Sequence, residues 1–259
     1  MPRNGRTVRL SDGIAPWARV AKTDFHRGLR DARRLYTTPL RWQAREWGAC
    51  TASFLVVALA FLTDETIRTV VTNLRGALPD ALAGFGHWIG SGRATLYLFV
   101  SLYLLGLSTG ASGVRRIGLL VAESYVFSGV ITIGTKSLVG RWRPYTGHGS
   151  LAFLPLTVGP NDHLSFPSGH ATIAFALSSV MACQFKNRLW QVFWYACAAV
   201  TALSRVYHDQ HWLSDVLLSA LIGTTVGVWL NNHHVKKETL EGSKSRQVLS
   251  PEDEAEIHA

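Results

Sequence analysis

Cysteine is scarce in this sequence. Only three of the 259 residues are cysteine, and Cys50, Cys183 and Cys197 all lie inside apolar stretches, where a thiol behaves as a small hydrophobic side chain. The chain has no cysteine framework for disulfides and no Cys/His spacing typical of zinc, which argues against a disulfide-stapled domain and a zinc module. No apolar stretch follows the first basic residues, so we expect no cleaved signal peptide.

Acidic residues are also few. Seventeen Asp and Glu residues stand against 26 Lys and Arg residues, which gives a formal net charge of +9. A basic balance can indicate a nucleic-acid partner, but the Lys and Arg residues here match no nucleic-acid motif. They gather in the segments between apolar runs, as membrane topology requires. We therefore expect a membrane bilayer, and no nucleic acid, as a partner.

Apolar residues are abundant and make up 47% of the chain. They concentrate in six runs, at roughly 47–63, 94–113, 117–135, 171–185, 189–203 and 213–230. A spanning helix needs about 20 mostly apolar residues, so flanking Trp, Arg and loop residues must complete the shorter runs. The pattern predicts an all-α polytopic membrane protein with a six-transmembrane-helix bundle. A soluble all-helical protein with buried core helices is the alternative.

Three parts are predicted along the chain: a basic segment over 1–46, a membrane domain over 47–230 and a polar tail over 231–259. The basic segment mixes Arg with apolar residues, which suits either an interfacial, partly helical segment or a disordered arm. Residues 66–92 are predicted to form an external loop along the bilayer surface. Glu123 lies inside the third apolar run, where an ionisable group is costly, so we expect it to face the bundle interior.

The distribution of basic residues predicts the orientation. With six spans and a cytoplasmic N-terminus, 19 of the 26 Lys and Arg residues fall on the cytoplasmic side, where such an excess is usual. The other seven are Arg68, Arg75, Arg93, Lys136, Arg141, Arg143 and Arg205. We therefore expect both termini in the cytoplasm, with the loop 137–168 and the turn 205–212 together on the opposite side. In a bacterium this means an inner-membrane protein with these loops in the periplasm.

Three short segments at the edges of the apolar runs hold side chains suited to phosphate chemistry. They are Lys136-x6-Arg143-Pro144, Pro167-Ser168-Gly169-His170 and Ser204-Arg205-x5-His211-x3-Asp215. Together they gather three permanent cations, two imidazoles, a hydroxyl and one carboxylate. A protein needs such a set to hold a phosphate group and attack it.

His211 and Asp215 are the candidate reactive pair. They lie four residues apart at the start of an apolar helix, so they share one face. The carboxylate can hydrogen-bond one imidazole nitrogen, which leaves the other nitrogen free to attack phosphorus. A plain surface hydrogen bond between the two side chains is the alternative.

The other two segments supply groups that can hold phosphate oxygens. Ser168 and Gly169 open a helix, and a helix N-terminus offers free N–H groups and the positive end of the helix dipole. His170 would stand beside the bound group as a proton donor. Three cations flank these segments: Lys136, Arg143 and Arg205. Taken singly, each cation is equally suited to anchor a span end at the membrane interface.

The full pattern K-x6-RP, PSGH and SR-x5-H-x3-D resembles the type 2 phosphatidic acid phosphatase superfamily, which includes bacterial membrane lipid phosphatases and vanadium-dependent haloperoxidases. All three motifs are complete, and the resemblance covers roughly residues 94–230. It implies that His211 forms a phosphohistidine, that Asp215 orients it, and that His170 protonates the leaving alcohol and then activates water. The residues that it implies for holding the phosphoryl oxygens are Lys136, Arg143, Ser168, Gly169 and Arg205. It also implies that the chemistry uses no metal and no other cofactor.

The resemblance therefore implies an integral membrane phosphatase that acts on a phosphorylated lipid, and the distribution of basic residues predicts that it acts at the periplasmic side. Phosphatidic acid, phosphatidylglycerol phosphate, polyprenyl diphosphate and a lipid A phosphate are all candidate substrates. Two alternatives stay open: a lipid phosphotransferase of the same superfamily and a vanadate-dependent haloperoxidase, against which the membrane runs argue. The sequence leaves the oligomeric state open.

Overall fold

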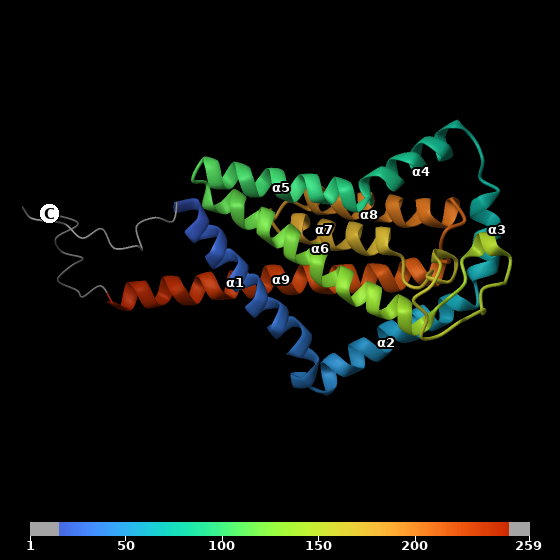
Figure 1. Cartoon of the computed structure of the whole chain (residues 1–259), viewed down its shortest axis with the longest axis horizontal. Helices are drawn as coiled ribbons and strands as arrows, with labels where there is room; N and C mark the ends of the chain where they lie inside the picture. Colours follow the sequence, from blue (N-terminus) through green and yellow to red (C-terminus); the bar gives the residue numbers. More distant parts are fainter. Residues whose placement is uncertain (1–15, 249–259) are drawn as a thin grey trace, which may run out of the picture.

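The computed structural model describes residues 16–248, and this part of the chain is helical apart from its loops (Figure 1). In chain order the α-helices are α1 (Pro16–Thr37), α2 (Ala44–Phe61), α3 (Asp64–Thr72), α4 (Ala77–Ile89), α5 (Gly92–Ser108), α6 (Ser112–Val139), α7 (Gly169–Ala182), α8 (Arg188–Tyr207) and α9 (Leu213–Val248). Short 3-10 turns lie at Thr38–Arg41, Pro144–Thr146 and Asn161–His163. The predicted all-α class is confirmed.

Helix α7 forms the centre of the bundle and packs against α6, α8 and α9. It is rich in Ala and Ser, and nine of its 14 residues are buried. Small residues on α9 allow the two helices to approach closely: a Cβ atom at Gly223 would lie 2.4 Å from the carbonyl oxygen of Thr172. This packing sets the beginning of α7 beside the beginning of α9.

The outer surface of the bundle is apolar. Large apolar side chains are exposed on α2 (Phe54, Leu59), α5 (Leu104, Leu105), α6 (Ile133) and α8 (Val192). Surfaces of this kind contact lipid or another protein. Three helical segments are long and apolar enough to cross a membrane: Ala44–Phe61, Ser112–Val139 and Leu213–His234. Helices α4 and α5, bent by 51° at their junction, make a fourth if they form one span, so the chain is an integral membrane protein.

The expected external loop over 66–92 is wrong. This segment contains most of α3 and all of α4, and α4 packs against α8. Gly86 makes the contact possible, since a Cβ atom there would lie 2.6 Å from the carbonyl oxygen of Val200. The glycines that suggested a loop therefore serve close helix packing.

The structure also decides between the two alternatives for the basic N-terminal segment, an interfacial helix or a disordered arm. Residues 16–37 form α1, which contacts α6 and α9 and buries Asp24, Asp31 and Leu35, so a disordered arm is excluded for this part. Residues 1–15 and 249–259 lie outside the described residues. Helix α9 runs without a break from the last apolar run into the polar tail, up to Val248.

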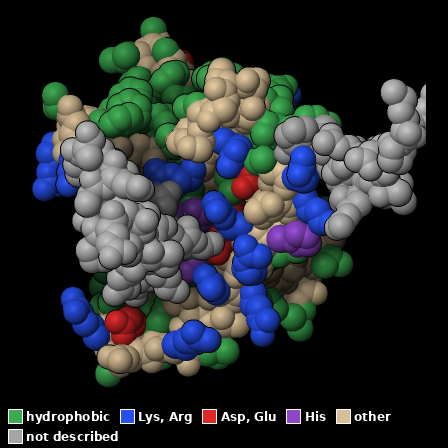
Figure 2. Space-filling view, turned by 90° about the vertical axis from the view of Figure 1, so that its left-hand side faces the viewer, with side chains coloured by type: hydrophobic (Ala, Val, Ile, Leu, Met, Phe, Trp, Pro, Cys, Tyr) green, Lys and Arg blue, Asp and Glu red, His purple; other side chains and the backbone are tan. Residues whose placement is uncertain are grey.

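Basic side chains gather at one end of the bundle. Figure 2 views this end, opposite to the long loop after α6, and shows many Lys and Arg side chains in blue. The elements that lie there are α1, the α5–α6 connection with Arg115 and Arg116, and the α7–α8 connection with Lys186 and Arg188. Glu123 is 5% exposed and faces the bundle interior, as expected.

Candidate active site

The opposite end of the bundle brings the three motifs together (Figure 1, right-hand side). Helices α6 and α8 end here, where α7 and α9 begin, so the eight predicted residues meet although they come from distant segments. Lys136 lies near the end of α6 and Arg205 near the end of α8. The remaining six lie in the loop after α6 and around the starts of α7 and α9: Arg143, Ser168, Gly169, His170, His211 and Asp215.

The loop after α6 begins with a glycine that the backbone requires. Gly140 ends α6 in the left-handed conformation, with φ of 59°, and a Cβ atom there would lie 1.7 Å from the carbonyl oxygen of Leu154. The next residue, Arg141, pairs with Phe153 in an isolated β-bridge. This turn directs Arg141 and Arg143 back over the starts of α7 and α9.

The predicted pair His211 and Asp215 is in contact. The Nδ1 atom of His211 lies 3.4 Å from Oδ2 of Asp215, and the same oxygen accepts a hydrogen bond from the backbone N–H of Trp212 at 2.9 Å. Burial lowers the pKa of His211 to about 3, helped by the positive charges of Lys136 and Arg143. The imidazole is therefore neutral at physiological pH. With its proton on Nδ1 toward the carboxylate, Nε2 presents a lone pair.

Arg143 faces that lone pair. Its Nη1 atom lies 3.4 Å from Nε2 of His211, while Nε and Nη2 donate to the backbone and side-chain oxygens of Asn161 at 2.9 and 2.8 Å. Nη1 also donates to the backbone and side-chain oxygens of Gln210, both at 3.2 Å. The guanidinium is therefore held in place beside Nε2 of His211, where its positive charge can attract an anion. Lys136 is fixed nearby through its ammonium group, which donates to the carbonyl oxygens of Leu164 and Ser165.

Arg205 contributes a donor that has no protein partner. Its side chain is 6% exposed, and its buried Nε atom has no hydrogen-bond acceptor in the described part of the chain. A buried donor without a partner is costly, so such a group commonly awaits a ligand. The Nη1 atom of Arg205 lies 2.7 Å from Nδ1 of His87, a residue of α4. The ring of His87 in turn stacks on His170, with 5.2 Å between ring centroids.

The start of α7 has the geometry of a capped helix. The hydroxyl oxygen of Ser168 accepts a hydrogen bond from the backbone N–H of Ala171, and Ser168 is fully buried. A Cβ atom at Gly169 would meet no atom within 4 Å, so packing does not require glycine here. Open space therefore lies beside this first turn, and the N–H groups at the start of a helix suit an anion.

Sequence reasoning missed Arg141, which is completely buried. Its guanidinium donates to Asp215 Oδ1 and to Asp64 Oδ2, both at 2.6 Å, and to Ser214 Oγ at 2.7 Å. Asp64, also missed, accepts the backbone N–H of Ser214 at 2.9 Å. This network fixes the carboxylate that faces His211. Arg141 precedes Arg143 by two residues, but in the sequence it was counted only among the seven basic residues outside the cytoplasmic segments.

A cavity of about 470 Å³ opens beside His170. It is lined by His87, Ser91, Gly92, Arg93, Leu96, Tyr125 and His170, so it combines apolar walls with one permanent cation. Its residues come from α4, α5, α6 and α7. Sequence reasoning also missed His87, because α4 was expected to be a loop.

Comparisons with known proteins agree with the three motifs. A family model described as the PAP2 superfamily matches residues 117–238. The lipid A 1-phosphatase of Rhizobium etli is 30% identical over 204 residues, which cover 71% of this chain and 82% of that protein. The lipid A 1-phosphatase of Rhizobium johnstonii is 29% identical over 210 residues, which cover 74% and 79%.

Two solved structures share the fold. One is the phosphatidylglycerolphosphate phosphatase of Bacillus subtilis, with a TM-score of 0.56, 22% identity and coverage of 72% of this chain and 96% of that one. The other is LpxE of Aquifex aeolicus, with a TM-score of 0.51, 20% identity and coverage of 64% and 93%. The relatives, the family model and the shared fold lead to one conclusion: the chain belongs to the PAP2 superfamily, the type 2 phosphatidic acid phosphatases and their kin.

Proposed function

We propose that this phosphatase hydrolyses a phosphate ester or diphosphate on a lipid through a phosphohistidine at His211. One observation carries the proposal: the neutral His211 ring is held between Asp215, which faces Nδ1, and Arg143, which faces Nε2. A nucleophile needs such an orienting partner on one side and a charge-stabilising group on the other. Asp215 orients the ring and fixes its tautomer.

In the first step, Nε2 of His211 forms a bond to phosphorus while the bond from phosphorus to the lipid oxygen breaks. His170 gives a proton to the departing oxygen. The charge on the phosphoryl oxygens is met by five groups: Lys136, Arg143, Arg205, the hydroxyl of Ser168 and the backbone N–H of Gly169. The unpaired Nε of Arg205 and the open first turn of α7 support this assignment.

In the second step, water replaces the histidine. His170 now takes a proton from the water molecule, whose oxygen bonds to phosphorus as the bond to Nε2 breaks, and inorganic phosphate leaves. The proton returns His170 to the state needed for the next turnover. Over the full cycle His170 passes one proton to the lipid alcohol and recovers one proton from water.

The role of His170 predicts a dependence on the leaving group. In His170→Ala, the first-turnover release of a lipid alcohol should fall by about 10²–10⁴-fold, because that oxygen needs a proton to depart. The first-turnover release of p-nitrophenol from p-nitrophenyl phosphate should fall far less, since this anion leaves unprotonated. Rapid-quench measurement of both substrates on wild type and variant gives the comparison. Equal losses for the two substrates would remove His170 from the acid role.

The cavity and the relatives support a proposal for the substrate class. The cavity beside His170 has room for part of a lipid headgroup, and Arg93 can pair with a second anionic group there. The matched relatives are lipid A 1-phosphatases. We propose a lipid A phosphate as the first candidate, ahead of phosphatidic acid, phosphatidylglycerol phosphate and polyprenyl diphosphate.

A panel of lipid phosphates tests the proposal. Purified protein in detergent micelles, with a chelator present, should release inorganic phosphate from at least one of the four candidates, and fastest from the lipid A phosphate. Assaying both free phosphate and any newly phosphorylated lipid separates hydrolysis from phosphotransfer. Release from none of the four would exclude the proposed substrate class, and a faster rate on another member would exclude lipid A.

We further propose that α2, the bent pair α4 and α5, α6, α7, α8 and α9 make six crossings, and that the membrane domain covers residues 47–230. In this arrangement the basic end of Figure 2 is cytoplasmic, and the residues around His211 face the periplasm. Both termini then lie in the cytoplasm of a bacterial cell, at its inner membrane.

This sidedness predicts a labelling pattern. Single cysteines are placed at Leu151 in the long loop and at Asn232 near the basic end, both exposed positions, in a background with Cys50, Cys183 and Cys197 replaced. In intact cells a membrane-impermeant thiol reagent should label position 151 and leave position 232 unlabelled until the cells are broken. The reverse pattern would place the site on the cytoplasmic side.

A further inference from the structure

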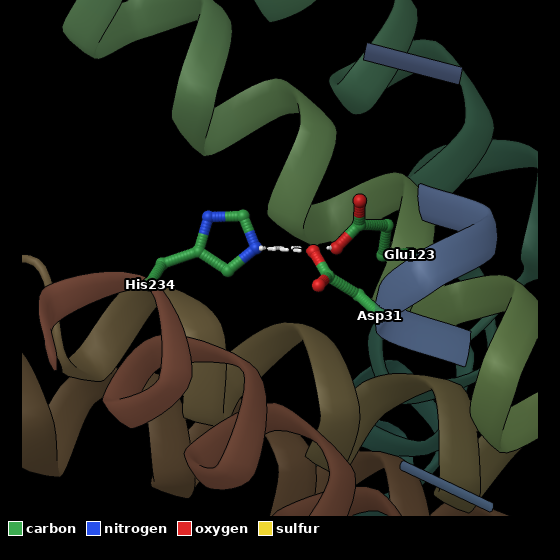
Figure 3. Close-up of side chains that lie close together, drawn as sticks. All are labelled: Asp31, Glu123 and His234. Atoms are coloured by element: carbon green, nitrogen blue, oxygen red, sulfur yellow. Dashed lines mark hydrogen bonds and ion pairs between the residues drawn. The ribbon is translucent and has the colours of Figure 1, made fainter. Parts of the chain in front are cut away.

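Three ionisable side chains from distant parts of the chain meet far from the active site. Asp31 comes from α1, Glu123 from α6 and His234 from α9, and they are 3%, 5% and 4% exposed. Figure 3 shows the imidazole pointing at both carboxylates. At a rise of about 1.5 Å per residue, Glu123 lies about 20 Å along α6 from Lys136, and His234 about 28 Å along α9 from Asp215.

Glu123 has a buried carboxylate without a hydrogen-bond donor. Neither of its oxygens has a hydrogen-bond partner in the described part of the chain, although both are inaccessible to solvent. The Nε2 atom of His234 lies 3.6 Å from Oε2, too far for a good hydrogen bond. A buried carboxylate in this condition is costly, so it calls for a cation or a proton.

The spacing of the ligand atoms fits a bound metal ion. One ligand atom from each of the three residues lies within 4.8 Å of the other two. Two ligands of a tetrahedral zinc ion, each about 2.0–2.1 Å from the metal, lie about 3.3 Å apart. The observed separations from His234 Nε2 are 3.1 Å to Asp31 Oδ2 and 3.6 Å to Glu123 Oε2, which bracket that value.

We propose that Asp31, Glu123 and His234 bind one divalent transition-metal ion of the zinc class. One imidazole and two carboxylates suit Zn²⁺ better than Mg²⁺, which prefers oxygen ligands alone and an octahedral shell. Water completes the tetrahedron. Each ligand comes from a different helix, so the ion ties the amphipathic helix α1 to the basic end of the bundle. The site takes no part in phosphate chemistry and does not depend on the proposed function.

The surroundings of the site offer a competing arrangement. Arg27 lies on α1 close to Glu123, and His233 Nε2 lies 3.4 Å from the second oxygen of Asp31. A protonated His234 between the two carboxylates would balance part of their charge without any metal ion. The two arrangements differ in metal stoichiometry, which makes them separable by experiment.

Zinc binding by the full-length protein tests the site. Purified protein is stripped with a chelator, returned to buffer and dialysed against graded Zn²⁺, with bound metal and the thermal unfolding midpoint both measured. Wild type should bind one high-affinity Zn²⁺ per chain. Its midpoint should rise by about 5–10 °C at a free Zn²⁺ concentration about 100-fold above Kd. Mg²⁺ at the same concentration should produce no shift.

Three variants locate the ion. Glu123→Gln keeps the shape of the side chain but should weaken Zn²⁺ binding by more than about 100-fold. Loss of a residue that only hydrogen-bonds a metal ligand costs about 10–100-fold in affinity, so a larger loss indicates a direct ligand. Gly28→Ala retains all three ligands but adds a methyl group 3.3 Å from Glu123 Oε1, so it should weaken binding by a smaller factor. Asp24→Asn is the matched control: it removes a buried carboxylate of α1 that pairs with Tyr103 and Arg115 instead.

The control should keep wild-type affinity within about threefold, since it acts at an independent site. Two results would overturn the proposal. One is the absence of stoichiometric Zn²⁺ in wild type, which would leave the protonated His234 arrangement. The other is equal Zn²⁺ affinity in wild type and Glu123→Gln, which would place the ion elsewhere. A folded Gly28→Ala with unchanged affinity would count against the proposal as well, should Glu123→Gln fail to fold.

Discussion

Replacing His211 with alanine should reduce turnover of the lipid substrate on the order of 10⁶-fold, the scale of loss seen when a hydrolase loses its nucleophile. This corresponds to about 8 kcal/mol of transition-state stabilisation. The reason is that, among the described residues, His211 is the histidine whose ring nitrogen lies beside Arg143. Arg143, Lys136 and Arg205 would still bind the phosphate, so KM should change much less than kcat.

Trapping of the intermediate provides the direct measurement. Wild type quenched during turnover of a ³²P-labelled substrate should carry base-stable, acid-labile label, and His211→Ala should carry none. His163→Ala is a suitable control, because it removes another buried histidine of the same end, one that contacts Thr157. Its activity should stay within about tenfold of wild type. Labelled protein in His211→Ala would place the nucleophile on another residue.

The motif residues could be predicted from the sequence because residues that act together lie close to one another along the chain. His211 and Asp215 lie one helical turn apart, and the Ser168 cap and Gly169 belong to one helix start. Alternating helix directions then carry Lys136 and Arg205 to the same end of the bundle. Each of these relations needs only the periodicity of a helix and the order of the apolar runs.

The supporting residues could not be predicted in this way. Arg141 and Asp64 lie 77 residues apart, and nothing in either segment indicates their contact. His87 was missed for a different reason. The glycines around it suggested a loop, whereas the structure uses Gly86 to press α4 against α8 and so bring His87 beside His170. Tertiary packing, which single-sequence periodicity does not record, decides both cases.

The same distinction applies to the membrane helices. The apolar run 117–135 lies entirely within α6, because this helix is apolar over most of its length. Helix α7 has only 14 residues and is buried by its neighbours. Its apolar composition can therefore reflect burial in the bundle core as much as contact with the bilayer. Hydropathy alone does not separate these two environments.

Asp215→Asn should lower kcat about 10⁴-fold, although it changes a single atom. Both carboxylate oxygens accept hydrogen bonds from nitrogens that cannot become acceptors: Oδ1 from the guanidinium of Arg141 and Oδ2 from the backbone N–H of Trp212. The amide nitrogen of asparagine must therefore face a donor in either orientation. With the amide nitrogen toward His211, the ring proton moves from Nδ1 to Nε2 and the nucleophilic lone pair is lost.

With the amide nitrogen toward Arg141 instead, the buried guanidinium loses one of its two carboxylate partners. Its remaining ion pair is then the one with Asp64. This orientation spares the tautomer but destabilises the fold, because breaking a buried ion pair costs about 3–5 kcal/mol. Asp215→Asn should therefore show both a slow first turnover and a lowered unfolding midpoint. Asp209→Asn, which removes a carboxylate from the partly exposed pair with Arg68, is the control and should show neither. Wild-type kcat in Asp215→Asn would mean that the carboxylate does not set the tautomer of His211, and the Arg141 network would then have a structural role alone.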